Sequence, residues 1–359
     1  MDYLDNLNPI IKDYFKILSN EFPKFLFDYI NTPRMQKQAG ISVSCGTYYS
    51  KMFDSSLWYS SLDHSIAVAL IIWHFTHDKK QALAGLFHDI STPVFKHCID
   101  FMNNDYENQE STEDLTKKMI LESTEIMKLL KRDNININEV ADYHIYPIAD
   151  NDTPMLSADR LEYTLSNGLG QVKKIWDLDD IQKLYKDITL VTNEFGNIEM
   201  CFNTLSTALK FTKAMSILSI CYINDKDRFS MQFLADIIKI MFEHNLIKVE
   251  DLYNLSEKEV IAKINNCHDF NIKEAFRIWQ TSDSVFVSEK KPINKYCVKV
   301  NAKKRYINPL VKTNNGIKRI SDISLIAKEQ IQSILDCTFN RYVYMNFNLD
   351  NKSKIKKIK

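Results

Sequence analysis

Glycine is scarce in this sequence, with 7 residues among 359, although glycine makes up about 7% of an average protein. Neither of two common nucleotide-binding motifs, GxGxxG and GxxxxGK(S/T), occurs anywhere in the chain. The sequence therefore excludes the glycine-rich loops that bind phosphate in dinucleotide-binding and P-loop folds.

Paired cysteines and long apolar segments are also missing. The 7 cysteines are widely spaced and include no CxxC pair, which is typical of reduced intracellular thiols and not of a disulfide framework or a zinc ribbon. The longest apolar run, near residues 66–73, is too short to cross a bilayer, and the N-terminus has no signal-peptide pattern. We therefore expect a cytoplasmic protein with no membrane partner.

The chain carries no net charge of either sign. Lysine plus arginine and aspartate plus glutamate each number 46, so bulk attraction to nucleic acid is not expected. The basic tail, residues 352–359, is an exception because it contains five lysines. Nucleic-acid binding through this tail is a minor hypothesis, and nucleic acid is otherwise not expected as a partner.

Helical periodicity dominates what is present. Apolar residues recur at helical spacing over 62–77 and 79–90, and the short gap between these segments predicts an antiparallel helix hairpin. Val-rich and Tyr-rich segments predict one or two strands within 295–311 and a strand at 341–349. Further helices are predicted at 115–131, 136–144, 156–168, 203–223, 229–245, 255–264 and 324–335. The sequence thus predicts a mainly α fold with a small β element near its C-terminus.

Four residues carry the chemistry that the sequence suggests: His64, the adjacent pair His88 and Asp89, and Asp159. Imidazole and carboxylate together suit a divalent transition metal. The predicted hairpin brings His64 near His88, and a third helix that folds back would add Asp159. Asp89 near a helix C-terminus opposes the helix dipole, which favours a specific role, whereas Asp159 in a first turn is equally explained by that dipole.

These residues resemble the H…HD…D signature of the HD-domain metal-dependent phosphohydrolases over roughly residues 30–170. Within that superfamily, the segments DHSIAVA, HDISTPVFKH and DRLEYTLSN resemble those of the deoxynucleoside triphosphate triphosphohydrolase branch. The resemblance implies an HD-domain helical bundle at 31–185. An N-terminal helical segment (1–30) would precede it, and a helical C-terminal region with the β element (186–351) and the basic tail would follow.

The same resemblance implies a divalent metal ion (Mn, Fe, Co, Ni, Zn or Mg) held by His64, His88, Asp89 and Asp159, with Asp89 also catalytic. It implies further roles for residues near this centre. Arg160 would hold phosphate, Tyr163 and Asn167 would contact sugar or base, and His97 and Glu110 would assist proton transfer. His144 is either a ligand of a second metal or a packed, hydrogen-bonded histidine.

Three positions depart from the branch pattern. Thr92 stands where the branch has a catalytic His, Ser61 where it has an Arg, and Asn167 where it has an Asp. We therefore expect a metal-dependent hydrolase of a nucleotide phosphoester or phosphoanhydride. The alternative is a catalytically weak nucleotide-binding sensor or regulatory protein with the same fold. A homo-oligomer is the default expectation.

Overall fold

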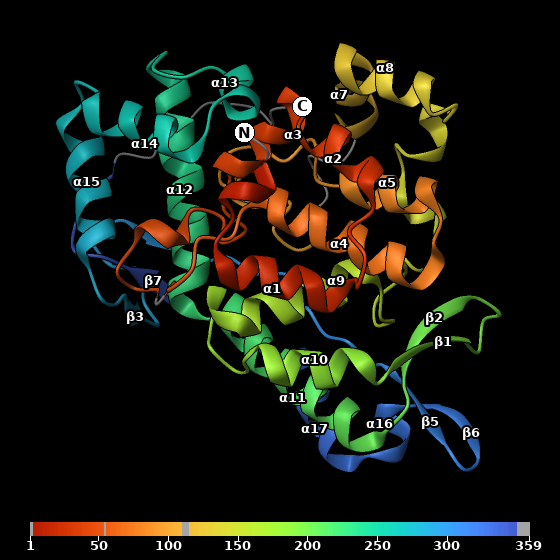
Figure 1. Cartoon of the computed structure of the whole chain (residues 1–359). Coiled ribbons are helices and arrows are strands. Elements are labelled where there is room, and N and C mark those ends of the chain that lie inside the picture. Colours follow the sequence, from red (N-terminus) through yellow and green to blue (C-terminus); the bar gives the residue numbers. More distant parts are fainter. Residues whose placement is uncertain (1–2, 54, 110–114, 350–359) are drawn as a thin grey trace.

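The protein is described by a computed structural model that covers residues 3–53, 55–109 and 115–349. Helices make up most of it, which confirms the predicted mainly α class (Figure 1). The α-helices are α1 (Pro9–Leu18), α2 (Lys24–Ile30), α3 (Pro33–Lys37), α4 (Ser61–Thr76), α5 (Lys79–Phe87), α6 (Cys98–Met102), α7 (Thr116–Glu122), α8 (Thr124–Arg132), α9 (Ala158–Ser166), α10 (Leu178–Lys186), α11 (Leu205–Ile223), α12 (Asp225–Glu243), α13 (Val249–Asn254), α14 (Glu257–Asn266), α15 (Phe270–Thr281), α16 (Ile320–Ile323) and α17 (Leu325–Leu335).

Two small sheets complete the described fold. The strands are β1 (Ile188–Thr192), β2 (Ile198–Phe202), β3 (Phe286–Ser288), β4 (Cys297–Val298), β5 (Leu310–Thr313), β6 (Gly316–Arg319) and β7 (Tyr342–Tyr344). One sheet has the order β1-β2-β5-β6, with β2 and β5 parallel and the other neighbours antiparallel. The other has the antiparallel order β3-β7-β4. In Figure 1 they lie at separate ends of the molecule.

The predicted hairpin is present as α4 and α5. A capping box between Ser60 and Asp63 starts α4, and Asp78 caps α5 with its side chain. Gly85 lets the two helices approach closely, because a Cβ at this position would lie 2.3 Å from the Ile72 side chain. Every residue from 61 to 72 is buried, so α4 is a central helix of the fold.

Buried side chains form two main clusters. The first surrounds α4, α5 and α9 and also takes residues from α1, α10 and α11. The second surrounds α12, α14 and α15 and includes α6 and β7. The segment after Asp89 leaves the first cluster and enters the second at Val94 and Phe95. The boundary predicted near residue 185 stays a prediction, and the basic tail lies outside the described residues.

Several predicted elements have different bounds in the structure. The helix predicted at 115–131 is two helices, because Ser123 ends α7 and its side chain caps α8. The helix predicted at 136–144 is replaced by two 3-10 turns, Ile137–Glu139 and Tyr143–Ile145. Among the described residues, no helix combines the length and apolar character that crossing a membrane requires.

The end of the helix predicted at 156–168 also differs. Ser157 caps α9 as predicted, but Gly168 does not terminate it, and the chain continues as a π-helix, Asn167–Gln171. The Trp176 ring packs against Gly168, where a Cβ would lie 2.5 Å from the indole. The glycine is therefore explained by close packing and not by a left-handed helix end.

Candidate metal centre

The four predicted ligands lie together where three helices meet. His64 is in the first turns of α4, His88 and Asp89 follow the end of α5, and Asp159 is in the first turn of α9. His64 Nε2 lies 3.1 Å from His88 Nε2 and 3.0 Å from Asp159 Oδ1. His88 Nε2 lies 3.8 Å from both Asp89 Oδ1 and Asp159 Oδ1. Two imidazole nitrogens therefore lie side by side, and Asp89 and Asp159 each place one carboxylate oxygen 3.8 Å from His88 Nε2.

Each histidine is oriented by a partner on its other ring nitrogen. His64 Nδ1 pairs with the carboxylate of Glu162 on α9, which is fully buried. His88 Nδ1 lies 2.7 Å from the carbonyl oxygen of Gly85. Because a carbonyl can only accept, His88 donates from Nδ1 and directs Nε2 into the cluster. Anchoring of this kind is typical of metal-ligating histidines.

The spacing of these atoms fits a single divalent ion. Ligands bound about 2.0–2.2 Å from one ion lie roughly 3.0–3.5 Å apart when they are adjacent, which is close to the observed separations. Donor atoms of His64, His88 and Asp89 all lie within 4.8 Å of one another. Mixed nitrogen and oxygen ligands suit Mn, Fe, Co, Ni or Zn. The cluster therefore suggests a divalent metal, as the sequence predicted.

Opposed charges control ionisation in the cluster. Burial lowers the pKa of His64, but the Glu162 and Asp159 carboxylates outweigh it and raise that pKa to about 10. Burial likewise opposes ionisation of Asp159, yet His64 and His88 hold its pKa below the ordinary value. The carboxylates that favour a proton on His64 would equally attract a metal cation.

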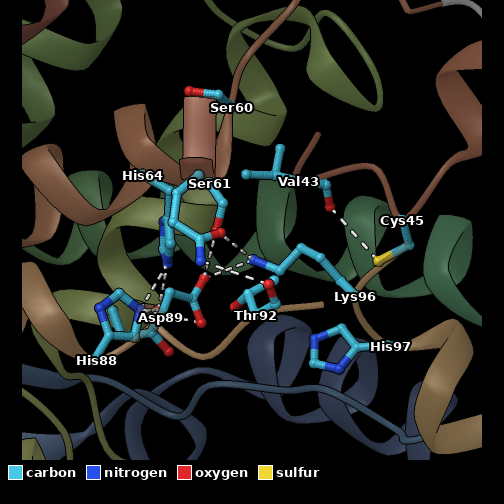
Figure 2. A network of polar contacts seen from close by, with 12 residues as sticks. Val43, Cys45, Ser60, Ser61, His64, His88, Asp89, Thr92, Lys96 and His97 are labelled. Atoms are coloured by element: carbon cyan, nitrogen blue, oxygen red, sulfur yellow. Dashed lines mark hydrogen bonds and ion pairs between the residues drawn. The ribbon is translucent and has the colours of Figure 1, made fainter. Parts of the chain in front are cut away.

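A lysine that the sequence analysis did not single out reaches this centre. Lys96 Nζ lies 2.6 Å from Asp89 Oδ2, and the Ser61 hydroxyl donates to the same oxygen at 3.1 Å (Figure 2). Burial opposes the charge of Lys96, but Asp89 outweighs burial and raises the lysine pKa. Asp89 thus directs Oδ1 toward His88 and Oδ2 toward a lysine and a hydroxyl.

An unusual turn brings Lys96 into the site. Phe95 and Lys96 both have left-handed backbone angles, with φ of 63° and 42°. Such a conformation costs an L-residue about 1–2 kcal/mol. The Phe95 ring is buried, and Gly46 packs directly against it, where a Cβ would lie 2.6 Å from the ring. Core packing therefore holds the turn.

Thr92, the position that departs most from the branch pattern, lies in the turn after the cluster. Its backbone N–H donates to the Asp89 carbonyl at 3.0 Å, and its own carbonyl accepts from Lys37 Nζ at 2.9 Å. The side chain is nearly buried and is not among the residues that line the adjoining cavity. Thr92 therefore contributes to the shape of the loop, while Lys96 and Ser61 contact Asp89.

A cavity of about 1110 Å³ opens from the cluster, and it is lined by the predicted residues His97, His144, Arg160, Tyr163 and Asn167. His97 Nδ1 lies 2.9 Å from Asp100 Oδ2, and its Nε2 lies 3.4 Å from the guanidinium of Arg305. Arg305 also donates to Gln109 and lies over the Tyr163 ring, 5.9 Å from its centroid. A residue from the C-terminal region therefore completes one wall.

The substrate-binding residues predicted on α9 and the turn after it have partners within the protein. Arg160 Nη1 lies 2.6 Å from Asn151 Oδ1 and 3.2 Å from Asp150 Oδ1. Asn167 Nδ2 donates to the Tyr222 hydroxyl at 2.7 Å. Burial raises the pKa of Tyr163 to about 12. All three predicted residues line the cavity, and their roles toward a ligand stay predictions.

Two further predicted residues have different outcomes. His144 lies on the cavity wall, half-exposed, with Nδ1 3.0 Å from Asp142 Oδ1 and Nε2 3.5 Å from Asp150 Oδ2. The Tyr143 ring contacts both His144 and His88, with ring centroids 4.4 Å and 5.0 Å away. The other residue, Glu110, lies outside the described residues, so the proton-transfer role predicted for it stays a prediction.

Sequence reasoning missed three residues that shape this site. Glu162 follows Asp159 by one helical turn, a spacing that places both on one face of α9. Lys96 precedes His97 in an otherwise apolar stretch. Arg305 lies in the basic segment KKRY, residues 303–306, far in sequence from the other site residues. The first two were detectable as charges in buried segments, whereas the third depends on the tertiary fold.

Comparisons with known proteins find distant relatives. No protein-family model matches the chain. The protein YdhJ of Bacillus subtilis strain 168, named as uncharacterized, is 24% identical in a match 258 residues long that covers 64% of this chain and 74% of YdhJ. The metal-dependent phosphohydrolase cns2 of Cordyceps militaris is 24% identical over 127 residues, 35% of this chain and 36% of cns2.

Two solved structures share the fold over most of both chains. A hypothetical protein from Aquifex aeolicus has a TM-score of 0.63 at 16% identity, covering 90% of this chain and 93% of its own. A phosphohydrolase from Bacteroides thetaiotaomicron has a TM-score of 0.64 at 12% identity, covering 92% and 97%. The two structures show a shared fold, and the sequence relative cns2 is named as a metal-dependent phosphohydrolase. None of the four names specifies a nucleotide.

Proposed function

We propose that this protein hydrolyses a phosphate ester or anhydride of a nucleotide with the help of a divalent metal ion. The observation that carries the proposal is the cluster of His64, His88 and Asp89, with Asp159 beside both histidines, at the wall of a large cavity. When bound there, such an ion polarises a phosphoryl group and lowers the pKa of water.

The residues around the cluster would keep it in a fixed arrangement. Glu162 holds the His64 ring through Nδ1, and the Gly85 carbonyl holds the His88 ring in the same way. Ser61 and Lys96 hold one oxygen of Asp89. Because these three residues are oriented before any substrate arrives, little reorganisation of them is required during the reaction.

The cavity supports a nucleotide as the substrate. Its volume of about 1110 Å³ slightly exceeds the 300–1,000 Å³ that is typical of small-molecule sites. Tyr163, Tyr222 and Asn167 offer aromatic and amide groups on one wall, and Arg305 offers a guanidinium beside them. Aromatic faces with a few polar groups suit a base and sugar, while guanidinium suits phosphate.

Resemblance to the deoxynucleoside triphosphate triphosphohydrolase branch supports a nucleoside triphosphate as the first substrate to test. The departures at Ser61, Thr92 and Asn167 weaken that assignment, because they fall on residues that the branch uses for catalysis and sugar selection. The nucleotide panel described below therefore also includes a deoxynucleotide or ribonucleotide with fewer phosphates. A homo-oligomer and a cytoplasmic location remain predictions.

The test measures metal content per chain and then phosphate release from a panel of nucleotides. We expect one ion per chain and turnover that Asp89→Ala abolishes, because Asp89 belongs to the donor set. Asp152→Asn is the matched control, since this exposed carboxylate lines the same cavity away from the cluster. Metal binding with tight nucleotide binding and no turnover would contradict hydrolysis.

A second candidate is a nucleotide-binding regulatory protein with little turnover. The observation that favours it is Thr92, which lies off the cavity wall and offers no imidazole where the branch has a catalytic His. Under this proposal the cavity would bind nucleotide and report it through the C-terminal region, which contributes Arg305. The experiment above separates the two candidates, because only the hydrolase releases phosphate.

A further inference from the structure

We propose that Lys96 is the cation that contacts a phosphoryl oxygen of the substrate beside the metal centre. This inference rests on the proposed phosphohydrolase function and assigns a substrate-binding residue that the sequence resemblance does not supply. Its test therefore measures anion binding and metal binding separately from turnover.

The position of Lys96 supports this role. Its Nζ lies 2.6 Å from Asp89 Oδ2 and 3.5 Å from Ser61 Oγ, and its side chain is 10% exposed. Figure 2 shows the aliphatic stem running past Thr92 so that the ammonium group ends beside Asp89 and Ser61. The residue also lines the large cavity. A substrate oxygen in the cavity beside Asp89 would therefore meet this ammonium group.

Other cations on the cavity wall are directed elsewhere. Arg160 is bound to Asp150 and Asn151, Arg305 contacts Gln109 and His97, and Lys226 donates to the Met52 carbonyl. Among the cavity-lining cations for which the structure gives contacts, Lys96 is the one bound to a predicted metal ligand. A cation at that place stabilises negative charge that develops at the reacting phosphoryl group.

The charges near the cluster indicate why a lysine is needed. Asp89, Asp159 and Glu162 bring three carboxylates to the two histidines, so a divalent ion alone leaves an excess of negative charge that would repel a phosphate. Lys96 offsets one carboxylate. An ammonium group is a compact charge that binds phosphate oxygens readily.

The backbone provides a second observation that supports this placement. Phe95 and Lys96 are consecutive left-handed residues, and strained conformations of this kind cluster at functional sites. Phe95 is buried in the second core cluster, so the turn directs Lys96 away from that core and toward the metal centre. An extended or helical backbone at these residues would direct the side chain differently.

The experiment compares wild type with Lys96→Met, Lys96→Gln and Lys96→Arg, each loaded with Co²⁺ or Mn²⁺. Calorimetry measures the affinity for the metal alone and then the affinity of the loaded protein for orthophosphate and orthovanadate. We expect Lys96→Met and Lys96→Gln to weaken anion binding at least tenfold, and Lys96→Arg to restore part of it. Metal affinity should stay equal or rise, because a neighbouring positive charge is removed.

Lys226→Met is the matched control, since Lys226 also lines the cavity but donates to a backbone carbonyl. It should leave anion affinity within threefold of wild type. Thermal melting establishes that each variant is folded, and Lys96→Gln replaces Lys96→Met if the latter does not fold.

Two results would overturn the inference while leaving the proposed function intact. One is unchanged anion affinity in metal-loaded Lys96→Gln, which would make Lys96 a counter-ion only. The other is a tenfold loss of metal affinity with no loss of anion affinity per loaded chain, which would make it a positioning residue for Asp89. Failure of the wild type to bind any metal would instead overturn the proposed function, and this inference with it.

Discussion

Replacing Glu162 by glutamine tests the metal centre at a residue that is not itself a ligand. Glu162 is 0% exposed and pairs with His64 Nδ1. It also accepts hydrogen bonds from the hydroxyls of Tyr59 at 2.6 Å and Tyr14 at 3.2 Å. The substitution keeps the shape of the side chain and removes its charge. It therefore asks whether the carboxylate is required to orient His64 and increase its basicity.

Loss of such a partner typically lowers metal affinity by about 10–100-fold, which corresponds to about 1.4–2.7 kcal/mol. We expect Glu162→Gln near the upper end of this range. The glutamine side chain has only one oxygen that can accept hydrogen bonds, whereas the carboxylate has two. A buried hydroxyl or imidazole group therefore loses its acceptor. A buried group without a partner costs a further ~1–3 kcal/mol of folding free energy.

The assay is calorimetric titration of metal-free protein with Co²⁺ or Mn²⁺, accompanied by thermal melts of the same samples. Glu257→Gln is the matched control, because Glu257 is also 0% exposed and has no contact with the four donors. Its metal affinity should equal that of wild type. A folded Glu162→Gln protein that binds metal within threefold of wild type would refute the reasoning, since the orientation of His64 would not depend on this carboxylate.

Three other expectations follow from the same contacts. In steady-state assays, Arg305→Met should raise KM at least tenfold with a smaller change in kcat, because Arg305 lies on the cavity wall away from the candidate metal ligands. An unchanged KM would contradict this. Burial raises the pKa of Glu257 to about 8, so between pH 4.5 and 8 the folded state retains a proton that the unfolded state has lost. The contribution of this group to the free energy of unfolding therefore falls as pH rises, by at most about 1.4 kcal/mol per pH unit. In urea melts at pH 5, 6 and 7, the stability of Glu257→Gln relative to wild type should therefore increase with pH. Chelation should lower Tm, because metal at 100 times its Kd stabilises by about 2.7 kcal/mol; an identical Tm with and without metal would exclude a structural contribution.

The helical part of the fold was predictable where apolar periodicity is local. The α4–α5 hairpin follows from spacing within each helix and a short gap between them, and its capping residues Ser60 and Asp78 are adjacent in sequence to the helices they start. The β1–β2 hairpin was missed although it has a local signal, the β-branched run at 188–192 followed by Gly196 with φ of 84°. The pairing of β2 with β5 joins residues more than 100 positions apart, which no local pattern specifies.

The candidate site shows the same difference between residues with a local sequence signal and residues whose contacts depend on the tertiary fold. His64, His88, Asp89 and Asp159 were predictable because their order and flanking residues form a recognisable motif. Lys96 lies only seven positions after Asp89, yet its contact depends on two left-handed residues that sequence periodicity does not indicate. Arg305 reaches Tyr163 only because the C-terminal region folds back over α9. Residues that orient or complete the candidate site were therefore harder to predict than its four candidate ligands.

His97 shows how the structure restricts a role that the sequence leaves open. Arginine can only donate, so the contact between Arg305 and His97 Nε2 requires a lone pair on that nitrogen. The proton then lies on Nδ1 and is donated to Asp100. Burial, assisted by Arg305, lowers the pKa of His97 despite the opposing effect of Asp100. A neutral imidazole in this state holds Arg305 in place and has no proton on the nitrogen that faces the cavity. Proton donation by His97 would therefore require Arg305 to move first, whereas positioning Arg305 requires no rearrangement.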